Sequence, residues 1–298
     1  MNLKTWGKGN RTSLINVGLV ILATIGATTI GAAMINRKVV SEDHLKLVYT
    51  LIATFTGGFL AYMSNRAIQQ TKEQAENRMA LSLAAFTILS NFDDLLNCRR
   101  TLRQEIKQQH DKFLDQGVEQ PPFWLVVRPI RYPFIPGKQI DYKALSFLLK
   151  TPAGYEAFRR MQNADQAHTA LKSDIDSLHD AATEALKQIA AEMAREHSDG
   201  LSLPRLEKYV TADIKGRVKS YIISILMRGE RDISLYRNTL TALTNEAKRN
   251  WPDVEAKDWN LYVAENIVNL PALPAHLQQA LDDGIEALKK RHTNRSRP

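Results

Sequence analysis

Two aspartate–histidine pairs at three-residue spacing are the residues of this chain whose arrangement most suggests chemistry. Asp165 precedes His168, and Asp176 precedes His179, within one stretch that lacks glycine and proline. A carboxylate and an imidazole at i and i+3 share one face of a helix, and di-iron helical bundles use a glutamate and a histidine at this spacing. The pattern therefore raises the question of a metal site inside a helical bundle.

The carboxylates that would complete such a site are absent from the sequence pattern. Asp93 and Asp94 are the nearest acidic residues on a candidate partner helix, and aspartate is shorter than the glutamate of the di-iron motif. We therefore expect no metal site. His168 falls in an apolar seam and is expected to be a core histidine bonded to a neighbour, whereas His179 is expected on a solvated face.

Nucleophilic catalysis has one candidate residue, Cys98. Arg99 and Arg100 follow it and could lower the pKa of its thiol, but no histidine is placed to activate it, so a buried and inert cysteine is expected. A single cysteine also excludes an intramolecular disulfide and a zinc site built on several cysteines. No glycine-rich phosphate loop is present. The sequence predicts a protein that is not an enzyme and needs no cofactor.

Two apolar runs at the start of the chain predict a transmembrane hairpin over residues 13–64. The first run extends from Ser13 to Ile35 and the second from Leu47 to Ser64, and neither contains a charged side chain. A helix of about 20 apolar residues spans the hydrocarbon core of a bilayer. The first run is longer than the core of a cleaved signal peptide, which is about 7–15 residues. It follows a basic tail, residues 1–12.

The distribution of lysine and arginine predicts the orientation of the hairpin. Six basic residues flank the runs on the side of the two termini, against three in the short link between the runs. Cytoplasmic flanks carry the excess of lysine and arginine. We therefore expect a two-span protein of a bacterial-type inner membrane with both termini in the cytoplasm. The terminal-side residues are Lys4, Lys8, Arg11, Arg66, Lys72 and Arg78, and those of the link are Arg37, Lys38 and Lys46.

Small residues recur at four-residue spacing in both runs. They allow two helix backbones to approach closely within a bilayer. The spacing is compatible with packing of the two spans on each other within one chain, or with an oligomeric interface or pore built from several chains. No ionisable residue lies inside either run, so an ion pathway based on such residues is not supported. The residues are Ala23, Ala27 and Gly31 in the first run, and Ala53, Gly57 and Ala61 in the second.

The remainder of the chain predicts a cytoplasmic helical domain over residues 65–288, followed by a basic tail, residues 289–298. Apolar residues at spacings of three and four indicate one helix from Arg66 to Gly117 and a second from Tyr155 to Arg195. We expect these two helices to pack antiparallel in a bundle, the first continuing from the membrane as a stalk. Further helices are expected over 204–228 and 230–250, interrupted at Gly229, and over 256–268 and 274–290.

A proline-rich segment, residues 118–140, separates the two predicted helices. Its prolines exclude a helix, and its apolar content is too high for a flexible linker. One interpretation is an extended segment, with a short strand pair, that lies in a groove of the helical domain. The other is a loop that contacts a partner or lipid headgroups. The candidate contact residues are Phe123, Trp124, Arg128, Arg131, Tyr132 and Phe134.

The charge balance and the absence of catalytic motifs decide the functional expectation. A net charge of +8 favours an acidic partner. The anionic cytoplasmic leaflet of the bilayer supplies one, and basic composition without stacking aromatic residues does not predict nucleic-acid binding. We expect an all-α, membrane-anchored, non-catalytic interaction protein, a sensor or scaffold with a protein partner or a second copy of itself. The alternative is an oligomerising two-span effector that perturbs membranes, as in defence or toxin systems.

Overall fold

The computed structural model describes residues 42–134, 139–196 and 203–252, together with single positions and short stretches within 26–33 and 272–286. These residues form helices and no strand, which confirms the all-α expectation. The helices are α2 (Glu42–Asp115), α3 (Pro152–Glu196), α4 (Leu203–Tyr209) and α5 (Ala212–Asn250). Two short 3₁₀ helices, η2 (Phe123–Leu125) and η3 (Ser146–Lys150), lie between α2 and α3. The predicted first span, 13–35, lies almost entirely outside the described residues.

The chain divides into two compact units, Met1–Met79 and Ala80–Pro298, and the division falls within α2. In the first unit, α2 contains the predicted second span, Leu47–Ser64. None of the described apolar side chains of this run is buried, and Phe55 is 78% exposed. Among the described residues α2 is the one helix long and apolar enough to cross a membrane, and none of its apolar window is buried within the protein. A bilayer core needs only about 20 of its residues.

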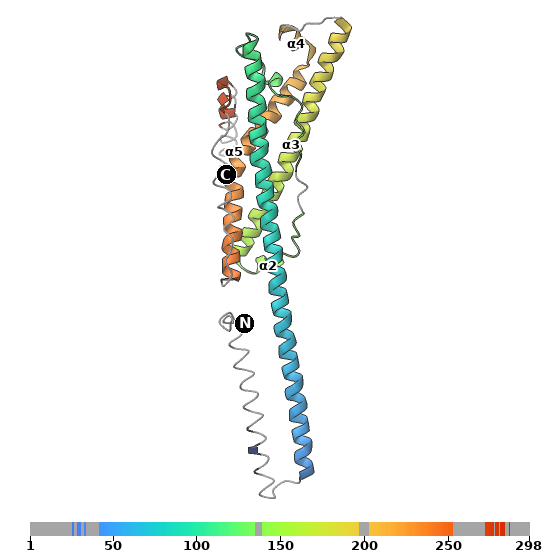
Figure 1. Cartoon of the computed structure of the whole chain (residues 1–298), viewed down its shortest axis with the longest axis vertical. Helices are drawn as coiled ribbons and strands as arrows, with labels where there is room; N and C mark the ends of the chain where they lie inside the picture. The colour runs from blue at the N-terminus through green and yellow to red at the C-terminus, as the bar shows by residue number, and fades with distance from the viewer. Residues whose placement is uncertain are drawn as a thin grey trace, which may run out of the picture. The chain divides into compact units, whose positions relative to one another are not determined.

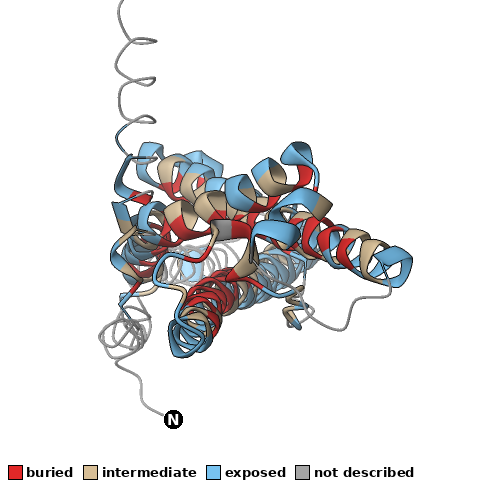
Figure 2. Cartoon of the chain, turned by 90° about the horizontal axis from the view of Figure 1, so that it is seen from above, coloured by how far each residue is buried: buried red, intermediate tan, exposed pale blue. Residues whose placement is uncertain are grey.

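In the second unit, the part of α2 from Ala80 onward packs with α3 and α5 around a shared core. The predicted apolar stripe of α2 is buried, with Ile88, Phe92 and Ile106 fully enclosed. The stripe of α3 and the inward face of α5 are buried in the same way, as the red inner faces of the helices show (Figure 2). The 3–4 spacing of apolar residues therefore predicted correctly which faces of these helices are buried.

Helices α3 and α5 run antiparallel. Thr239 of α5 donates a hydrogen bond to the Arg160 carbonyl near the start of α3 (3.3 Å). Towards the other end of the pair, Arg217 of α5 forms an ion pair with Glu184 of α3 (2.8 Å). Residue numbers thus rise along one helix as they fall along the other. Helix α5 is likewise antiparallel to α2. The rings of Phe92 and Tyr236 stack with centroids 5.3 Å apart, and Arg99, later in α2, pairs with Glu230, earlier in α5.

Helices α2 and α3 run parallel, so the predicted antiparallel pairing of these two helices is wrong. Asp94 of α2 meets His168 of α3 (3.1 Å), and Cys98 lies beside Ile175 of α3, so residue numbers rise together. The proline-rich segment returns along the bundle before α3 begins (Figure 1). An extended chain advances about 3.1 Å per residue against 1.5 Å for a helix, so this segment is long enough to return and repeat the direction of α2.

The start of α3 lies at a proline rather than after it. Pro152 occupies the first helical position, where its missing N–H costs nothing. The hydroxyl of Thr151 accepts a hydrogen bond from the Gly154 N–H (3.0 Å), which caps the helix. Gly154 is required because a Cβ there would lie 2.1 Å from the Leu148 carbonyl oxygen of η3. Helix α3 therefore begins at Pro152, three residues before the predicted start at Tyr155.

Helix α5 continues through Gly229, so the predicted interruption at that residue is wrong. A Cβ on Gly229 would lie 2.9 Å from Cδ of Arg99. The glycine therefore makes room for a buried arginine of α2, and the helix is not interrupted there. The predicted helix over 204–228 also differs from the structure, because its first residues belong to α4 and the rest to α5, which begins at Ala212.

Candidate functional site

The proline-rich segment places an apolar stretch against the helical bundle. Trp124, in η2, is 7% exposed, and Val126 and Val127 are buried with it in the shared core. The ammonium group of Lys215 lies over the Trp124 ring, 5.7 Å from its centroid. The residues described within 118–140 lie along the helices without forming a strand. This arrangement favours the interpretation of an extended segment in a groove, without the strand pair that it included.

A chain of side chains ties this segment to α2 and α3. Tyr132 packs edge-on against Phe134 (centroids 5.0 Å apart), and Phe134 packs edge-on against His168 (5.6 Å). Nε2 of His168 shares a hydrogen bond with Oδ2 of Asp94 (3.1 Å). The ammonium group of Lys172 lies 6.0 Å from the centroid of Phe134. The aromatic residues thus anchor the segment, and burial followed by the charge of Asp94 raises the pKa of Tyr132.

Of the predicted contact residues whose side chains the structure describes, only the two arginines are exposed. Trp124 is buried and Tyr132 and Phe134 are half-buried, so these rings pack against the bundle; the predicted contact surface itself stays a prediction. Arg128 and Arg131 are exposed. Nε of Arg131 donates a hydrogen bond to Nε2 of His179 (3.2 Å). Phe123 begins η2, and the position of its side chain lies outside what the structure describes.

The two aspartate–histidine pairs do not act as pairs. His168 bonds to Asp94 of the neighbouring helix, which confirms the expected core histidine, while Asp165 accepts a hydrogen bond from the Tyr142 hydroxyl (2.9 Å). Burial, reinforced by the hydrogen bond to Asp165, raises the pKa of Tyr142. His179 is half-buried under Arg131 rather than on an open face. No group of three or more candidate metal ligands exists among the described residues.

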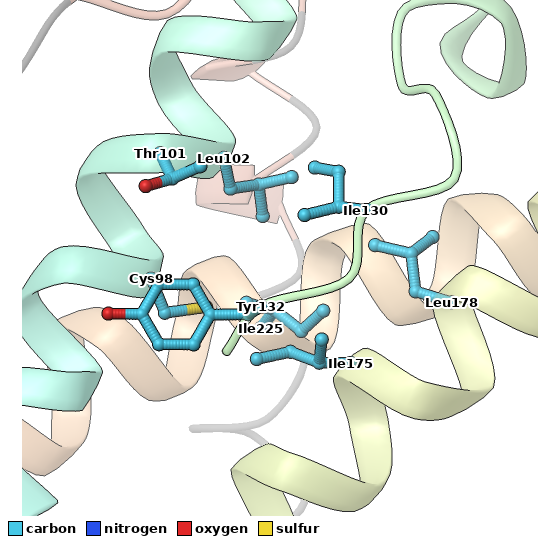
Figure 3. Close-up of a pocket in the computed structure, with 8 residues that line it drawn as sticks. All are labelled: Cys98, Thr101, Leu102, Ile130, Tyr132, Ile175, Leu178 and Ile225. Carbon is cyan, nitrogen blue, oxygen red and sulfur yellow. The ribbon is translucent and has the colours of Figure 1, made fainter. Parts of the chain in front are cut away.

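A small pocket beside Cys98 is where α2, α3, α5 and the proline-rich segment meet (Figure 3). Its lining is largely aliphatic, and the Tyr132 ring lies at one side of the Cys98 sulfur. Burial, reinforced by the nearby charge of Asp94, raises the pKa of the Cys98 thiol to about 12. The neighbouring arginines therefore do not activate it, and the thiol stays protonated at neutral pH. The lining residues are Cys98, Thr101, Leu102, Ile130, Tyr132, Ile175, Leu178 and Ile225.

Sequence reasoning missed a cluster of buried charges between α2 and α5. Arg99 and Arg103 have side chains 7% and 10% exposed, and both pair with the Glu230 carboxylate, Arg103 at 3.2 Å. Burial and the neighbouring Arg103 lower the pKa of Arg99 to about 10. The signal available in the sequence was Arg99 itself, which lies in the apolar seam of α2. Its partner on α5 could not be identified before the helices were paired.

The small residues of the second run lie on an open face of α2. Ala53, Gly57 and Ala61 are exposed, and a Cβ on Gly57 would meet no atom within 4 Å. The half-covered side chains of this run belong to a different face, which includes Ile52 and Met63. The corresponding residues of the first run, Ala23, Ala27 and Gly31, lie outside the described residues.

Comparisons with known proteins were made at three levels. No protein-family model, no curated protein and no solved structure matches this chain.

Proposed function

We propose that this chain is a membrane-anchored helical interaction protein, a sensor or scaffold of a bacterial-type inner membrane that acts by binding and not by catalysis. The bilayer holds residues 13–64 as two spans, and both termini lie in the cytoplasm. The helical bundle that begins within α2 presents the binding surface to a protein partner. No cofactor takes part.

The exposure of the second apolar run carries this proposal. Leu51 and Phe55 are 63% and 78% exposed, and no residue of the apolar window is buried within the protein. So large an apolar surface is unfavourable in water, at about 25 cal/mol per Å², and favourable in hydrocarbon. Further along the same helix the apolar face changes to one that is buried by α3 and α5. One helix therefore has one stretch suited to lipid and another suited to a protein core.

The exposed arginines of the proline-rich segment supply the binding surface of this proposal. Arg128 and Arg131 project from a segment whose rings are anchored in the core, so their backbone is held in place. A guanidinium on a fixed backbone loses less freedom when it binds than one on a mobile loop. Carboxylates on a partner protein match these groups in charge and in bidentate geometry.

Cysteine accessibility tests the membrane topology. Ser41→Cys lies in the link between the spans and is expected to react with an impermeant maleimide in intact cells. Thr293→Cys, in the basic tail, is expected to react only after the membrane is opened. The native Cys98 is buried and gives little background. Labelling in the reverse pattern would refute the proposed orientation, and recovery of the full chain in the soluble fraction would refute the anchor.

Charge reversal tests the binding surface. Cells that carry Arg128→Glu with Arg131→Glu are expected to lose the partner in affinity purification, because each carboxylate repels an acidic partner. Lys187→Glu is the matched control, since it reverses an exposed charge on α3 away from the segment. Equal retention of the partner by the double variant and by the control would remove the segment from the binding surface.

A second candidate function is supported by the open face of Ala53, Gly57 and Ala61. In this alternative, the hairpins of several chains associate through that face and perturb the membrane when the bundle is triggered. Overexpression with a membrane-potential dye is expected to show depolarisation by the native chain, and Gly57→Leu is expected to abolish it because leucine keeps the backbones apart. Gly58→Leu is the matched control on the adjacent residue. A native chain that leaves the potential unchanged under every trigger would count against this alternative.

A further inference from the structure

Two histidines from distant parts of the chain lie ring against ring in the second unit. His110 belongs to α2, a short distance before its end, and His276 belongs to the C-terminal residues described within 272–286. Their ring centroids are 5.5 Å apart, and the ring planes are inclined by 32°. The side chain of His110 is only 13% exposed. The pair joins the C-terminal segment to the bundle, and both rings are partly buried.

The hydrogen bonds around His276 show which nitrogen would take up a proton. The Pro121 carbonyl lies within hydrogen-bonding reach of this ring. Nε2 is buried and has no partner, so Nδ1 carries the hydrogen that Pro121 accepts. Nε2 is then the free basic nitrogen, and it lies beside a second imidazole instead of beside an acid. Burial and the proximity of His110 accordingly lower the pKa of His276.

Among the described residues, few charges near the pair oppose this effect. The Asp111 carboxylate lies 3.9 Å from Nδ1 of His110 and is 56% exposed, so solvent weakens its influence. On the C-terminal segment, Asp282 and Asp283 accept hydrogen bonds from Gln278 and Gln279 at 3.0 and 2.9 Å. On the connecting loop, the described contact to His276 is the neutral carbonyl of Pro121. A proton on Nε2 of His276 would therefore lie in a partly buried position with a second imidazole beside it and no described carboxylate bonded to it.

The same segment is held by a small apolar contact. Leu273 and Leu281 are buried, 8% and 1% exposed, and both join the shared core. Between them the Gln278 N–H donates to the Pro274 carbonyl (2.9 Å), which closes one helical turn. Among the described residues, two buried leucines and the imidazole pair hold the segment on the bundle.

We propose that His276, packed against His110, is a pH-sensitive clasp that holds the C-terminal segment, residues 272–283, on the bundle while the His276 ring is neutral and releases the segment when that ring is protonated. The clasp is independent of the proposed membrane function. It would make any surface under the segment accessible to a partner only at acidic pH. The relevant range begins near the ordinary histidine pKa of about 6.5, because that is where a released His276 takes up its proton.

The sign of the effect follows from the bound protons. The released segment binds a proton on His276 at a higher pH than the docked segment does, so falling pH favours release. Docking is complete above the ordinary histidine pKa, and it is lost as the pH falls towards the lowered pKa of His276 in the docked segment. Each unit by which docking lowers the pKa changes the docking equilibrium about tenfold over that range.

Hydrogen exchange of the full chain in detergent micelles tests the clasp. Exchange is followed by mass spectrometry at about pH 7.5 and about pH 5.5, on either side of the ordinary histidine pKa, with times scaled for the intrinsic rate. EDTA is present so that no metal bridges the imidazoles. Amides of 272–283 are expected to lose about tenfold or more of their protection at the lower pH, while the amides of α3 keep theirs. Equal protection of 272–283 at both pH values would overturn the proposal.

Two neutral replacements separate the charge from the packing. His276→Gln retains a polar side chain that cannot be protonated, and it is expected to keep 272–283 protected at both pH values. His110→Gln leaves His276 buried, and it is expected to keep only part of the loss at the lower pH. His44→Gln, which removes an exposed histidine of the first unit, is the matched control and is expected to release the segment as the native chain does. Release at the lower pH in His276→Gln would also overturn the proposal.

Discussion

A matched pair of glycine substitutions in α5 gives the sharpest test of how the bundle is packed. Gly216 and Gly229 both lie in this helix, and alanine is the better helix former at either position by about 1 kcal/mol. Around Gly216 a Cβ would meet nothing within 4 Å, so Gly216→Ala should stabilise the protein by about that amount. At Gly229 the new methyl would lie 2.9 Å from Cδ and 3.2 Å from Cγ of Arg99.

The arginine has little freedom to move away from that methyl. Its side chain is 7% exposed, and its guanidinium is fixed on the Glu230 carboxylate. Overpacking of this kind costs about 1–3 kcal/mol, which exceeds the gain in helix propensity. Gly229→Ala should therefore destabilise the bundle by about 1–2 kcal/mol, opposite in sign to Gly216→Ala. The two melting temperatures should differ by roughly 4–10 °C in a unit of this size.

Urea unfolding of the detergent-solubilised chain, followed by tryptophan fluorescence, measures both changes, since Trp124 is buried in the core. An Arg99→Ala background supplies the control, because it removes the atoms that the methyl would strike. There Gly229→Ala should stabilise by about 1 kcal/mol, as Gly216→Ala does. Equal stabilisation by the two glycine substitutions in the native background would refute the packing argument for the uninterrupted helix.

Three further predictions concern the anchored segment, the thiol and a buried hydroxyl. Trp124→Ala should lower the free energy of unfolding by about 3–5 kcal/mol in the same urea titration, because it removes a buried indole, whereas Arg128→Ala should change it by less than about 0.5 kcal/mol. Cys98, with its pKa raised to about 12, should react with a disulfide reagent near pH 8 about a thousandfold more slowly in the folded chain than in urea; similar rates would show that the thiol is accessible as thiolate. Tyr236→Phe should cost about 1 kcal/mol, because the hydroxyl donates to the Ala164 carbonyl (3.0 Å), and no loss in urea unfolding would mean that this bond is absent.

The helices and their buried faces were predictable because helix formation and amphipathicity are local properties. Leu81, Ile88 and Ile106 repeat at the spacing of a helix, and this spacing identified the buried face of α2 without any knowledge of what covers it. The prolines likewise excluded a helix over 118–140, because a missing N–H and a fixed φ act on the chain within a few residues. The apolar run Leu47–Ser64 was recognisable from composition and length alone.

The candidate site was predictable only in part, because a residue type does not reveal its neighbour. Trp124 and Arg131 were both plausible contact residues by composition, yet one is buried and the other exposed. Both aspartate–histidine pairs had the spacing of a shared helix face, yet His168 bonds to Asp94 and not to Asp165. Arg99 is a charged residue in an apolar seam, and only the paired helices show that the Glu230 carboxylate balances its charge.

The positions of the helices, their apolar faces and the stretch near the start of the chain that suits a membrane all follow from local sequence. The parallel direction of α3 and α2, the arginine beside Gly229 and the meeting of His110 with His276 emerge only when the helices pack together. Periodicity and backbone restriction act between residues a few positions apart, whereas direction, close approach and charge pairing depend on elements that meet only when the whole core closes.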